Sequence, residues 1–304
     1  MSVPPDFVIA GAPKCGTTAL YEYLSRHPEI FMPRIKEPKY FCSDLKTTDG
    51  VYTLTEYRQL FAAAPAHCLT GDASALYMYS KVAIERIMEN NPRTKVIVML
   101  RHPVEAAHSL YAARWSHHVE NIASFEQAWR AQTARLTGEL LPPRWPDPLT
   151  LQYGSMYCYA QQVHRLLQRV PASQRHIVVF EEFFAAPHRH YAELVRFLSV
   201  SPDERCEFPV VNPTTGARSE RVEELLRTPP AWLRAAYRPI RPLFRATRVR
   251  PWSILRNLNS TSVRKPLLTS SPFRAEMERY FASDISQLEA MLGRPLWRQS
   301  GSAP

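Results

Sequence analysis

The residues best suited to chemistry lie in a short loop near the start of the chain. An apolar run at 6–10 leads into the sequence GAPKCGTT at 11–18, and an amphipathic run follows. A strand, a glycine-bearing loop and a helix start present backbone N–H groups to an anion. Gly11 and Gly16 have the spacing of the common nucleotide-binding loop G-x-x-x-x-G-K-[ST]. The sequence therefore predicts a phosphate-binding loop.

The lysine of this loop is in an unusual place. Thr17 stands where the common motif has lysine, and Lys14 lies inside the loop. An ATP or GTP site needs a lysine on the β- and γ-phosphates and a hydroxyl on Mg²⁺. Lys14 is instead suited to the first phosphate and the group attached to it, as in a nucleotide with a single 5′-phosphate-linked unit. A purely structural strand-to-helix turn is the alternative.

A second block joins an arginine to a buried strand. The apolar run at 95–100 ends at Arg101, and Ser109 follows eight residues later. An arginine at the carboxyl end of a parallel strand can hold a phosphate with two N–H groups, and a serine on the next helix can add a hydroxyl. The alternative is a surface arginine with a serine near a helix cap.

Together, segments 12–18 and 96–103 resemble the 5′-phosphosulfate and 3′-phosphate motifs of sulfotransferases that use 3′-phosphoadenosine 5′-phosphosulfate (PAPS). The resemblance covers most of the chain and is nearer to the heparan-sulfate-type and bacterial branch of these P-loop enzymes than to the cytosolic phenol and steroid branch. It implies PAPS as the cosubstrate, with Lys14 also neutralising the leaving phosphate. The implied nucleotide-binding residues are Lys14, Cys15, Gly16, Thr17, Thr18, Arg101 and Ser109.

Sulfuryl transfer also needs a base that takes the acceptor's proton. The segment KEPKYF at 36–41 resembles the family segment that carries a glutamate base, which makes Glu37 the first candidate. A solvated carboxylate between two lysines is its alternative reading. Asp72 is the rival candidate, because active-site residues gather at the carboxyl ends of strands in open α/β sheets. A helix or turn cap is the alternative for Asp72.

Histidines offer a third source of a base, since another sulfotransferase branch uses one. Four lie in or near the arginine–serine motif: His102, His108, His117 and His118. We expect them to be structural or exposed, and the alternative for His117 and His118 is that they line the acceptor pocket. No His, Cys or Asp spacing suggests a set of metal ligands, so we predict a mechanism without a metal.

The chain departs from the heparan-type pattern in two places. Ala73 stands where those enzymes often carry a second lysine, and the late Lys-Gly-Arg loop over the 3′-phosphate is missing. We expect the segment 212–219, with Arg218, to replace that loop. Phe208 is a candidate for stacking on the adenine ring.

Alternating strands and helices must position these residues. Buried strands are predicted at 6–10, 68–73, 95–100 and 177–180, and helices after Thr18, at 81–89, from 103, and at 157–167, 191–198 and 274–292. This alternation predicts a P-loop-type α/β fold, in which helices flank a central parallel sheet in three layers, with a helical C-terminal extension. We expect one sulfotransferase domain over 1–304.

Basic charge is concentrated in one segment. Residues 225–275 contain ten arginines, one lysine and no acidic residue, while the whole chain has a net charge of +10. The rest is therefore near neutral, so we expect no nucleic-acid partner. Apolar residues interleave the arginines, which predicts an Arg-rich insertion or lid-like segment that shapes acceptor entry. A solvated surface and a peripheral membrane contact are the alternatives.

The overall composition is that of a globular protein. Of its 304 residues, 45% are hydrophobic and 22% are charged. No apolar run reaches the roughly 18 residues of a transmembrane helix. The five cysteines are scattered and lack a C-x-x-C pair, which argues against a disulfide framework or a zinc site. With no secretory signal visible, we expect a cytoplasmic protein.

Three functions fit the sequence. A P-loop small-molecule kinase would share the strand, loop and helix, but Thr17 replaces its lysine. An anion-binding interaction protein with an inactive nucleotide site would use the Arg-rich segment. The Lys14 loop and the Arg101–Ser109 pair favour a sulfotransferase that transfers a sulfuryl group from PAPS to a hydroxyl or amine of a small-molecule or saccharide acceptor. The sequence does not identify that acceptor.

Overall fold

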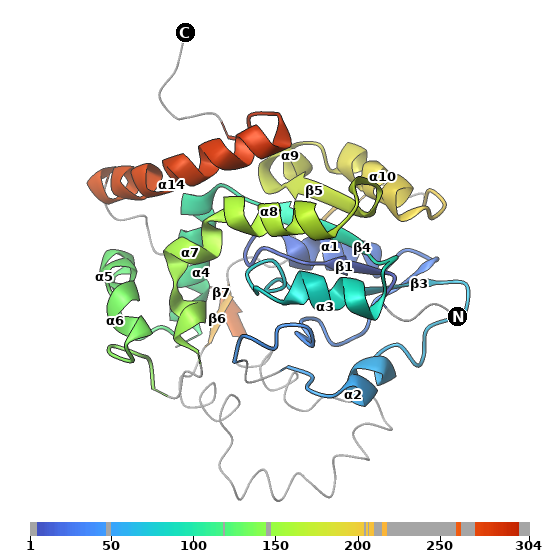
Figure 1. Cartoon of the computed structure of the whole chain (residues 1–304), viewed down its shortest axis with the longest axis horizontal. Coiled ribbons are helices and arrows are strands. Elements are labelled where there is room, and N and C mark those ends of the chain that lie inside the picture. Colours follow the sequence, from blue (N-terminus) through green and yellow to red (C-terminus); the bar gives the residue numbers. More distant parts are fainter. Residues whose placement is uncertain are drawn as a thin grey trace, which may run out of the picture.

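The structure, a computed structural model, describes most of the chain as an α/β fold (Figure 1). The described residues are 5–46, 50–117, 119–143, 147–203, 205, 207–209, 215–217, 260–262 and 271–297.

Five parallel strands form the central sheet in the order β2-β3-β1-β4-β5. Their bounds are β1 Phe7–Ile9, β2 Ile30–Phe31, β3 Leu69–Ala73, β4 Lys95–Leu100 and β5 Arg175–Val179. The β1 residues and Val96–Leu100 are fully buried. Strands covered on both faces carry continuous apolar runs rather than alternating ones. The predicted parallel sheet is confirmed.

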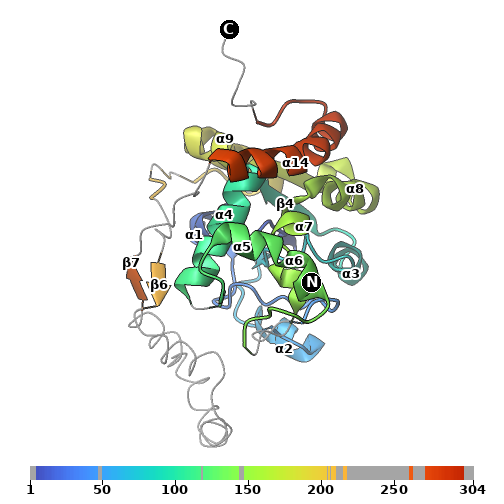
Figure 2. The ribbon, with the colours of Figure 1, turned by 90° about the vertical axis from the view of Figure 1, so that its left-hand side faces the viewer.

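Helices cover both faces of this sheet. Helix α1, Thr17–Leu24, lies on one face, and α3, Ala83–Asn90, and α8, Tyr159–Arg169, lie on the other (Figure 2). The remaining helices of the main body are α2 Leu54–Gln59, α4 Pro103–Ser116, α5 Phe125–Arg130, α6 Gln132–Leu136, α7 Tyr153–Tyr157, α9 Phe180–Ala185 and α10 Pro187–Leu198, with short 3₁₀ turns at Pro148–Leu151 and Ala172–Gln174. The predicted three-layer arrangement is therefore confirmed.

The C-terminal extension is helical, as expected. Helix α14, Ser271–Leu292, packs on α8 and α4 and crosses the top of the molecule in Figure 1. Its buried side includes Met277, Phe281 and Leu288. The helix brings the tail at 293–297 to the sheet end where β4 and β5 finish, and so carries distant sequence to the predicted site.

Several local predictions differ from the structure. The strand predicted at 177–180 runs from Arg175 to Val179, and Phe180 begins α9. The helix predicted at 157–167 is broken at Cys158, whose extended backbone separates α7 from α8. No sequence pattern predicts strand β6, Thr215–Ala217, which pairs antiparallel with β7, Ser260–Ser262. The strand and the helices lie where the sequence predicts them, but tertiary contacts set their boundaries.

Among the residues that the structure describes, no helix is long and apolar enough to cross a membrane. The described residues do not test the single-domain prediction. They also leave out most of the Arg-rich segment 225–275. Only 260–262 and 271–275 of that segment are described.

Candidate active site

The predicted phosphate loop connects β1 to α1 at the carboxyl end of the sheet. Its backbone continues the sheet pattern, since Ala12 N–H donates to Met99 O at 2.6 Å and Met99 N–H donates to Gly11 O at 2.7 Å. Lys14 is exposed and has a φ of 61°, in the left-handed region that non-glycine residues rarely adopt. The loop thus presents the lysine to solvent at the N-terminus of α1, where anions bind.

The loop's glycines are required by close packing. Gly16 has a φ of 89°, and a Cβ there would lie 3.0 Å from the Phe180 ring. Gly11 has a φ of 154°, and a Cβ there would lie 2.7 Å from Ala75 O. Both positions therefore exclude a side chain on two grounds, backbone conformation and space.

Two tyrosines brace the loop from beneath. Tyr157 Oη donates to Pro13 O at 3.0 Å, and Tyr159 Oη lies 3.5 Å from Cys15 Sγ. Cys15 is fully buried, and burial raises the pKa of its thiol to about 12. Cys15 is therefore a neutral packing residue, and only its backbone is left for the predicted contact with a nucleotide.

Arg101 follows β4 and reaches back to the loop. Its Nη1–H donates to Lys14 O at 3.3 Å, and its guanidinium lies 4.5 Å from the centre of the Phe180 ring. Arg101 Nε is buried and has no hydrogen-bond partner among the described residues. A buried unsatisfied N–H group at a predicted phosphate site is suited to an incoming anion. The structure thus brings Lys14 and Arg101 together.

Ser109 lies two turns into α4, which begins at Pro103, and its side chain is buried. Of the histidines, His108 is buried against Phe125, with ring centroids 5.6 Å apart. His117 caps the end of α4. Burial lowers the pKa of His102, which therefore stays neutral at pH 7.

Glu37 lies beside the loop because the end of β3 holds it there. Its N–H donates to Ala73 O at 2.9 Å, and its Oε2 accepts from Ala75 N–H at 2.9 Å. Its Oε1 pairs with Lys36 Nζ at 2.6 Å, and its side chain is 25% exposed. The carbonyl oxygen of the same Ala75 lies 2.7 Å from the place that a Cβ on Gly11 would occupy. Glu37 and the phosphate loop therefore share Ala75 as a neighbour. This carboxylate is held and is still accessible.

Asp72 is enclosed in a cage of hydroxyl groups. It accepts from Tyr77 Oη at 2.6 Å, Tyr57 Oη at 2.8 Å and Ser74 Oγ at 3.0 Å, and it is 0% exposed. Burial raises the pKa of Asp72 to about 6, although these three hydrogen bonds oppose the shift. Ser74 Oγ in turn accepts from Lys39 N–H at 3.0 Å. Asp72 therefore supports the segment that carries Glu37, and the geometry favours Glu37 as the base.

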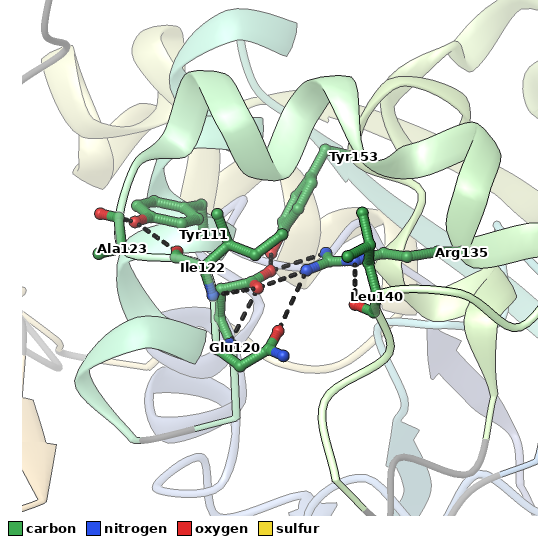
Figure 3. Close-up of polar contacts among 8 residues, drawn as sticks. Tyr111, Glu120, Ile122, Ala123, Arg135, Leu140 and Tyr153 are labelled. Atoms are coloured by element: carbon green, nitrogen blue, oxygen red, sulfur yellow. Dashed lines mark hydrogen bonds and ion pairs between the residues drawn. The ribbon is translucent and has the colours of Figure 1, made fainter.

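A buried ion pair joins the segment between α4 and α5 to helix α6 (Figure 3). Arg135 Nη1–H donates to Glu120 Oε2 at 2.8 Å, and both side chains are 0% exposed. Tyr153 Oη donates to the same carboxylate at 2.6 Å. Burial alone would raise the pKa of Glu120, but the hydrogen bonds from Arg135 and Tyr153 outweigh it and keep the pKa below its ordinary value. Because Tyr153 begins α7 and Tyr157 ends it, this pair helps to place the tyrosine that braces the loop.

Some predicted residues cannot be located. Arg218 lies outside the described residues, as do His118 and most of the segment 212–219. Phe208 is described and packs edge-on against Tyr23, with centroids 5.1 Å apart. Among the described residues, no group of three or more His, Cys, Asp or Glu side chains could hold a metal ion. The metal-free mechanism stays a prediction.

Sequence reasoning missed the residues that support the site. Tyr157, Tyr159 and Phe180 lie far from the loop in sequence and have the composition of ordinary core aromatics. Only the hydroxyl contacts at Pro13 and Cys15 and the guanidinium contact at Phe180 distinguish them. No sequence signal carried that information.

Comparisons with known proteins identify the family of this chain. Residues 4–215 match the sulfotransferase domain, and the chain belongs to this family. A bifunctional heparan sulfate N-deacetylase/N-sulfotransferase 4 from Mus musculus is 30% identical over 206 residues, which cover 65% of this chain and 22% of that protein. A carbohydrate sulfotransferase 15 from Mus musculus is 32% identical over 149 residues, covering 35% of this chain and 27% of that protein.

The matched region thus spans about a quarter of these curated relatives. Among solved structures, a sulfotransferase from Alicyclobacillus acidocaldarius superposes with a TM-score of 0.70 at 24% identity and covers 96% of this chain and 97% of its own. That likeness shows the fold. The resemblance to the heparan-sulfate-type and bacterial branch is confirmed, and family membership does not favour the kinase alternative.

Proposed function

We propose that this protein transfers a sulfuryl group from PAPS to a hydroxyl or amine of a small-molecule or saccharide acceptor. The observation that carries the proposal is the juxtaposition of Lys14, Arg101 and Glu37 around one loop. Arg101 donates to the Lys14 carbonyl, and Glu37 is held by Ala75, whose carbonyl oxygen leaves no room for a Cβ on Gly11. Two cations beside a helix N-terminus suit the donor's phosphates, and an accessible carboxylate suits the acceptor's proton.

In this mechanism the loop binds the 5′-phosphosulfate and Arg101, with Ser109, binds the 3′-phosphate. The bond between sulfur and the 5′-phosphate oxygen breaks as a bond forms between sulfur and the acceptor oxygen or nitrogen. Glu37 takes the acceptor's proton, and 3′-phosphoadenosine 5′-phosphate leaves. Lys14 and the N–H groups of the α1 N-terminus stabilise the charge that develops on the leaving phosphate.

The structure offers one further argument for a 3′-phosphate. The buried Arg101 Nε has no hydrogen-bond partner in the described part of the chain, and unsatisfied buried donors are costly in a folded protein. A bound phosphate would satisfy it. The stacked Phe180 ring keeps the guanidinium plane in a fixed orientation for this contact.

A saccharide is the acceptor class to test first, because two relatives are named for heparan sulfate and carbohydrate. Saccharides that offer a free amine and saccharides that offer only hydroxyls separate N- from O-transfer. Transfer of labelled sulfate to neither class would move the search to small-molecule acceptors. We expect this activity in the cytoplasm. The Arg-rich segment 225–275 is proposed to contact an acidic group of the acceptor, or alternatively an anionic membrane surface.

A thermal-shift experiment tests the donor. A ligand that binds only the folded state raises the unfolding temperature. We expect 3′-phosphoadenosine 5′-phosphate to raise it more than ATP with Mg²⁺ at equal concentration. A larger shift with ATP and Mg²⁺ would contradict the sulfotransferase proposal and favour the kinase. Lys14→Ala is the matched variant, and it should lose most of the shift.

A further inference from the structure

The peptide unit between Arg101 and His102 is held from both sides. Its carbonyl, Arg101 O, accepts from Tyr159 Oη at 3.1 Å. Its N–H, on His102, donates to Glu181 Oε1 at 3.1 Å. This peptide is the point where the chain leaves β4, so its orientation sets the direction of the Arg101 side chain.

Trp297, at the end of the described C-terminal tail, touches both of these holding groups. Its indole N–H donates to Glu181 Oε2 at 3.0 Å, the carboxylate oxygen that His102 does not use. Its ring lies 6.3 Å from the Tyr159 ring and 5.7 Å, edge-on, from the His102 ring. One side chain therefore contacts every partner of the Arg101–His102 peptide.

The tail itself is anchored independently. Arg294 forms two hydrogen bonds to Glu182, at 2.5 and 3.1 Å, and Leu296 N–H donates to Glu289 Oε1 at 2.8 Å. Leu296 is buried. Helix α14 thus delivers Trp297 to a defined place beside α9, as the upper part of Figure 1 shows for the two helices.

We infer that Trp297 is a positioning residue for Arg101, and that it tunes the affinity of the site for the 3′-phosphate of the nucleotide. This inference rests on the proposed function, because it assigns a role within the same nucleotide site. It also gives a purpose to Leu296 and Trp297, which neither the loop nor the base explains.

The physical reason lies in the exposure of Glu181. An exposed carboxylate holds a backbone N–H weakly, because water competes for it and the side chain has several rotamers. A second donor on the other carboxylate oxygen restricts those rotamers, so the bond to His102 forms at lower entropic cost. Trp297 supplies that donor and also limits the tilt of the Tyr159 ring. Loss of the indole N–H should therefore loosen the peptide without removing any group that touches the nucleotide.

Calorimetric titration of 3′-phosphoadenosine 5′-phosphate and of adenosine 5′-phosphate separates this role from a general one. Only the first nucleotide carries the 3′-phosphate. Trp297→Phe keeps a ring but lacks the N–H donor. It should raise the Kd of the 3′-phosphorylated nucleotide roughly 3- to 10-fold, the equivalent of one modest hydrogen bond. The Kd of adenosine 5′-phosphate should stay unchanged. Equal losses for both nucleotides, or none for either, would overturn the inference.

Arg294→Met is the matched control. It removes the neighbouring contact between the tail and α9 but touches neither Glu181 nor the Arg101–His102 peptide. We expect it to leave both Kd values unchanged, because the buried Leu296 side chain and the bond from Leu296 N–H to Glu289 still hold Trp297 in place. A loss equal to that of Trp297→Phe would show a general clamp by the tail and would contradict a specific role for Trp297. Thermal unfolding of both variants checks that each is folded.

Hydrogen exchange distinguishes failure of this inference from failure of the proposed function. In the protein without nucleotide, the His102 amide should exchange faster in Trp297→Phe than in the wild type, and Arg294→Met should match the wild type. Unchanged exchange would overturn the link between Trp297 and the peptide, whatever the enzyme binds. If exchange changes as expected and the wild type shows no preference for the 3′-phosphorylated nucleotide, the proposed function fails and the link between Trp297 and the peptide remains.

Discussion

The carboxylates of Glu37 and Asp72 are supported by the same strand end, yet their surroundings are opposite. Glu37 is 25% exposed, with Lys36 on one oxygen and the Ala75 N–H on the other. Asp72 is fully buried, and hydroxyl groups surround it. A general base must reach the proton that it takes, so exposure separates the two roles. In the sequence the two were rivals on different grounds, since Glu37 lies in a segment that resembles the family segment with a glutamate base, and Asp72 lies at the carboxyl end of a predicted strand.

Glu120 shows what a full charge partner adds. Like that of Asp72, its side chain is fully buried, but Arg135 lies against it. The guanidinium keeps the pKa of Glu120 below its ordinary value, whereas the neutral hydroxyls around Asp72 leave its pKa raised. Burial removes water from both carboxylates, and of the two only Glu120 has a positively charged partner that compensates for this loss. The difference between hydroxyl and guanidinium partners can be tested directly.

The largest effect is expected from removing that guanidinium. Arg135→Met leaves Glu120 buried without its ion pair and should lower the free energy of unfolding by about 3–5 kcal/mol. Urea denaturation measures it. The matched control is Arg130→Met, whose side chain is 55% exposed and pairs with Glu126 and Glu276. We expect the control to lose less than about 1 kcal/mol, as exposed pairs do. Similar losses for both would show that burial does not distinguish the pairs.

The second effect is a difference in the pH dependence of stability. The pKa of Asp72 is raised from 3.8 to about 6 in the folded protein. The contribution of Asp72 protonation to the free energy of unfolding is therefore complete below about pH 3.8. It is lost as pH rises through 6, a change of about 3 kcal/mol at most. Relative to Asp72→Asn, the wild type should gain stability as pH falls from 7 to 4.

Glu120 should show the opposite sign. Its pKa is lowered in the folded protein, so its contribution is present above the ordinary value of 4.5 and is lost as pH falls through the folded pKa. Relative to Glu120→Gln, the wild type should lose stability on acidification. Urea denaturation between pH 4 and 7 measures the difference for Asp72, and the series is extended below pH 4 for Glu120, because its contribution is lost only below its ordinary pKa of 4.5. Slopes of the same sign would contradict the contrast between the two buried carboxylates.

The third effect concerns activity. Glu37→Gln should lower kcat at least roughly 100-fold, the usual share of a general base, because the amide cannot accept the proton. Affinity for 3′-phosphoadenosine 5′-phosphate should stay unchanged, since the amide still accepts from Ala75 N–H. Steady-state kinetics and calorimetry measure the two quantities. An active Glu37→Gln with an inactive Asp72→Asn would assign the base to Asp72 instead.

The smallest effect is the loss of one hydroxyl from the Asp72 cage. Tyr77→Phe should lower the free energy of unfolding by roughly 1.5 kcal/mol, because two donors still remain for the carboxylate. Tyr79→Phe is the control, since its hydroxyl binds the neutral Leu149 O and Ser155 Oγ. Its loss should be about 0.5 kcal/mol, as for a partly exposed neutral bond. Equal losses would indicate that the charge of Asp72 does not strengthen its bonds.

Much of the fold could be predicted because local patterns carried it. The continuous apolar runs at Phe7–Ile9 and Lys95–Leu100 specified strands buried on both faces, and the helical period at 274–292 specified α14. Short helices such as α5 and α6 were missed because six residues or fewer hold too little periodicity. The break at Cys158 was missed for another reason, since the apolar pattern runs through it.

For the site, residue types and their spacing along the chain specify which groups bring charge and where the backbone must turn. Lys14 and Arg101 were identified by residue type and by position after strands, Glu37 by the resemblance of its segment to a family motif, and Gly11 and Gly16 by spacing. Those features depend on neighbours a few residues away, which the sequence lists in order.

Packing between distant segments sets which partners hold each charged group and whether solvent reaches it. It placed Tyr157 and Tyr159 under the loop, enclosed Asp72 in hydroxyls and brought Trp297 to the Arg101–His102 peptide. These contacts join residues between five and nearly two hundred positions apart, and the pKa of a carboxylate depends on burial and partners rather than on residue type. The exposure that makes Glu37 suited to catalysis, and the burial that gives Asp72 a supporting role, arise from packing alone.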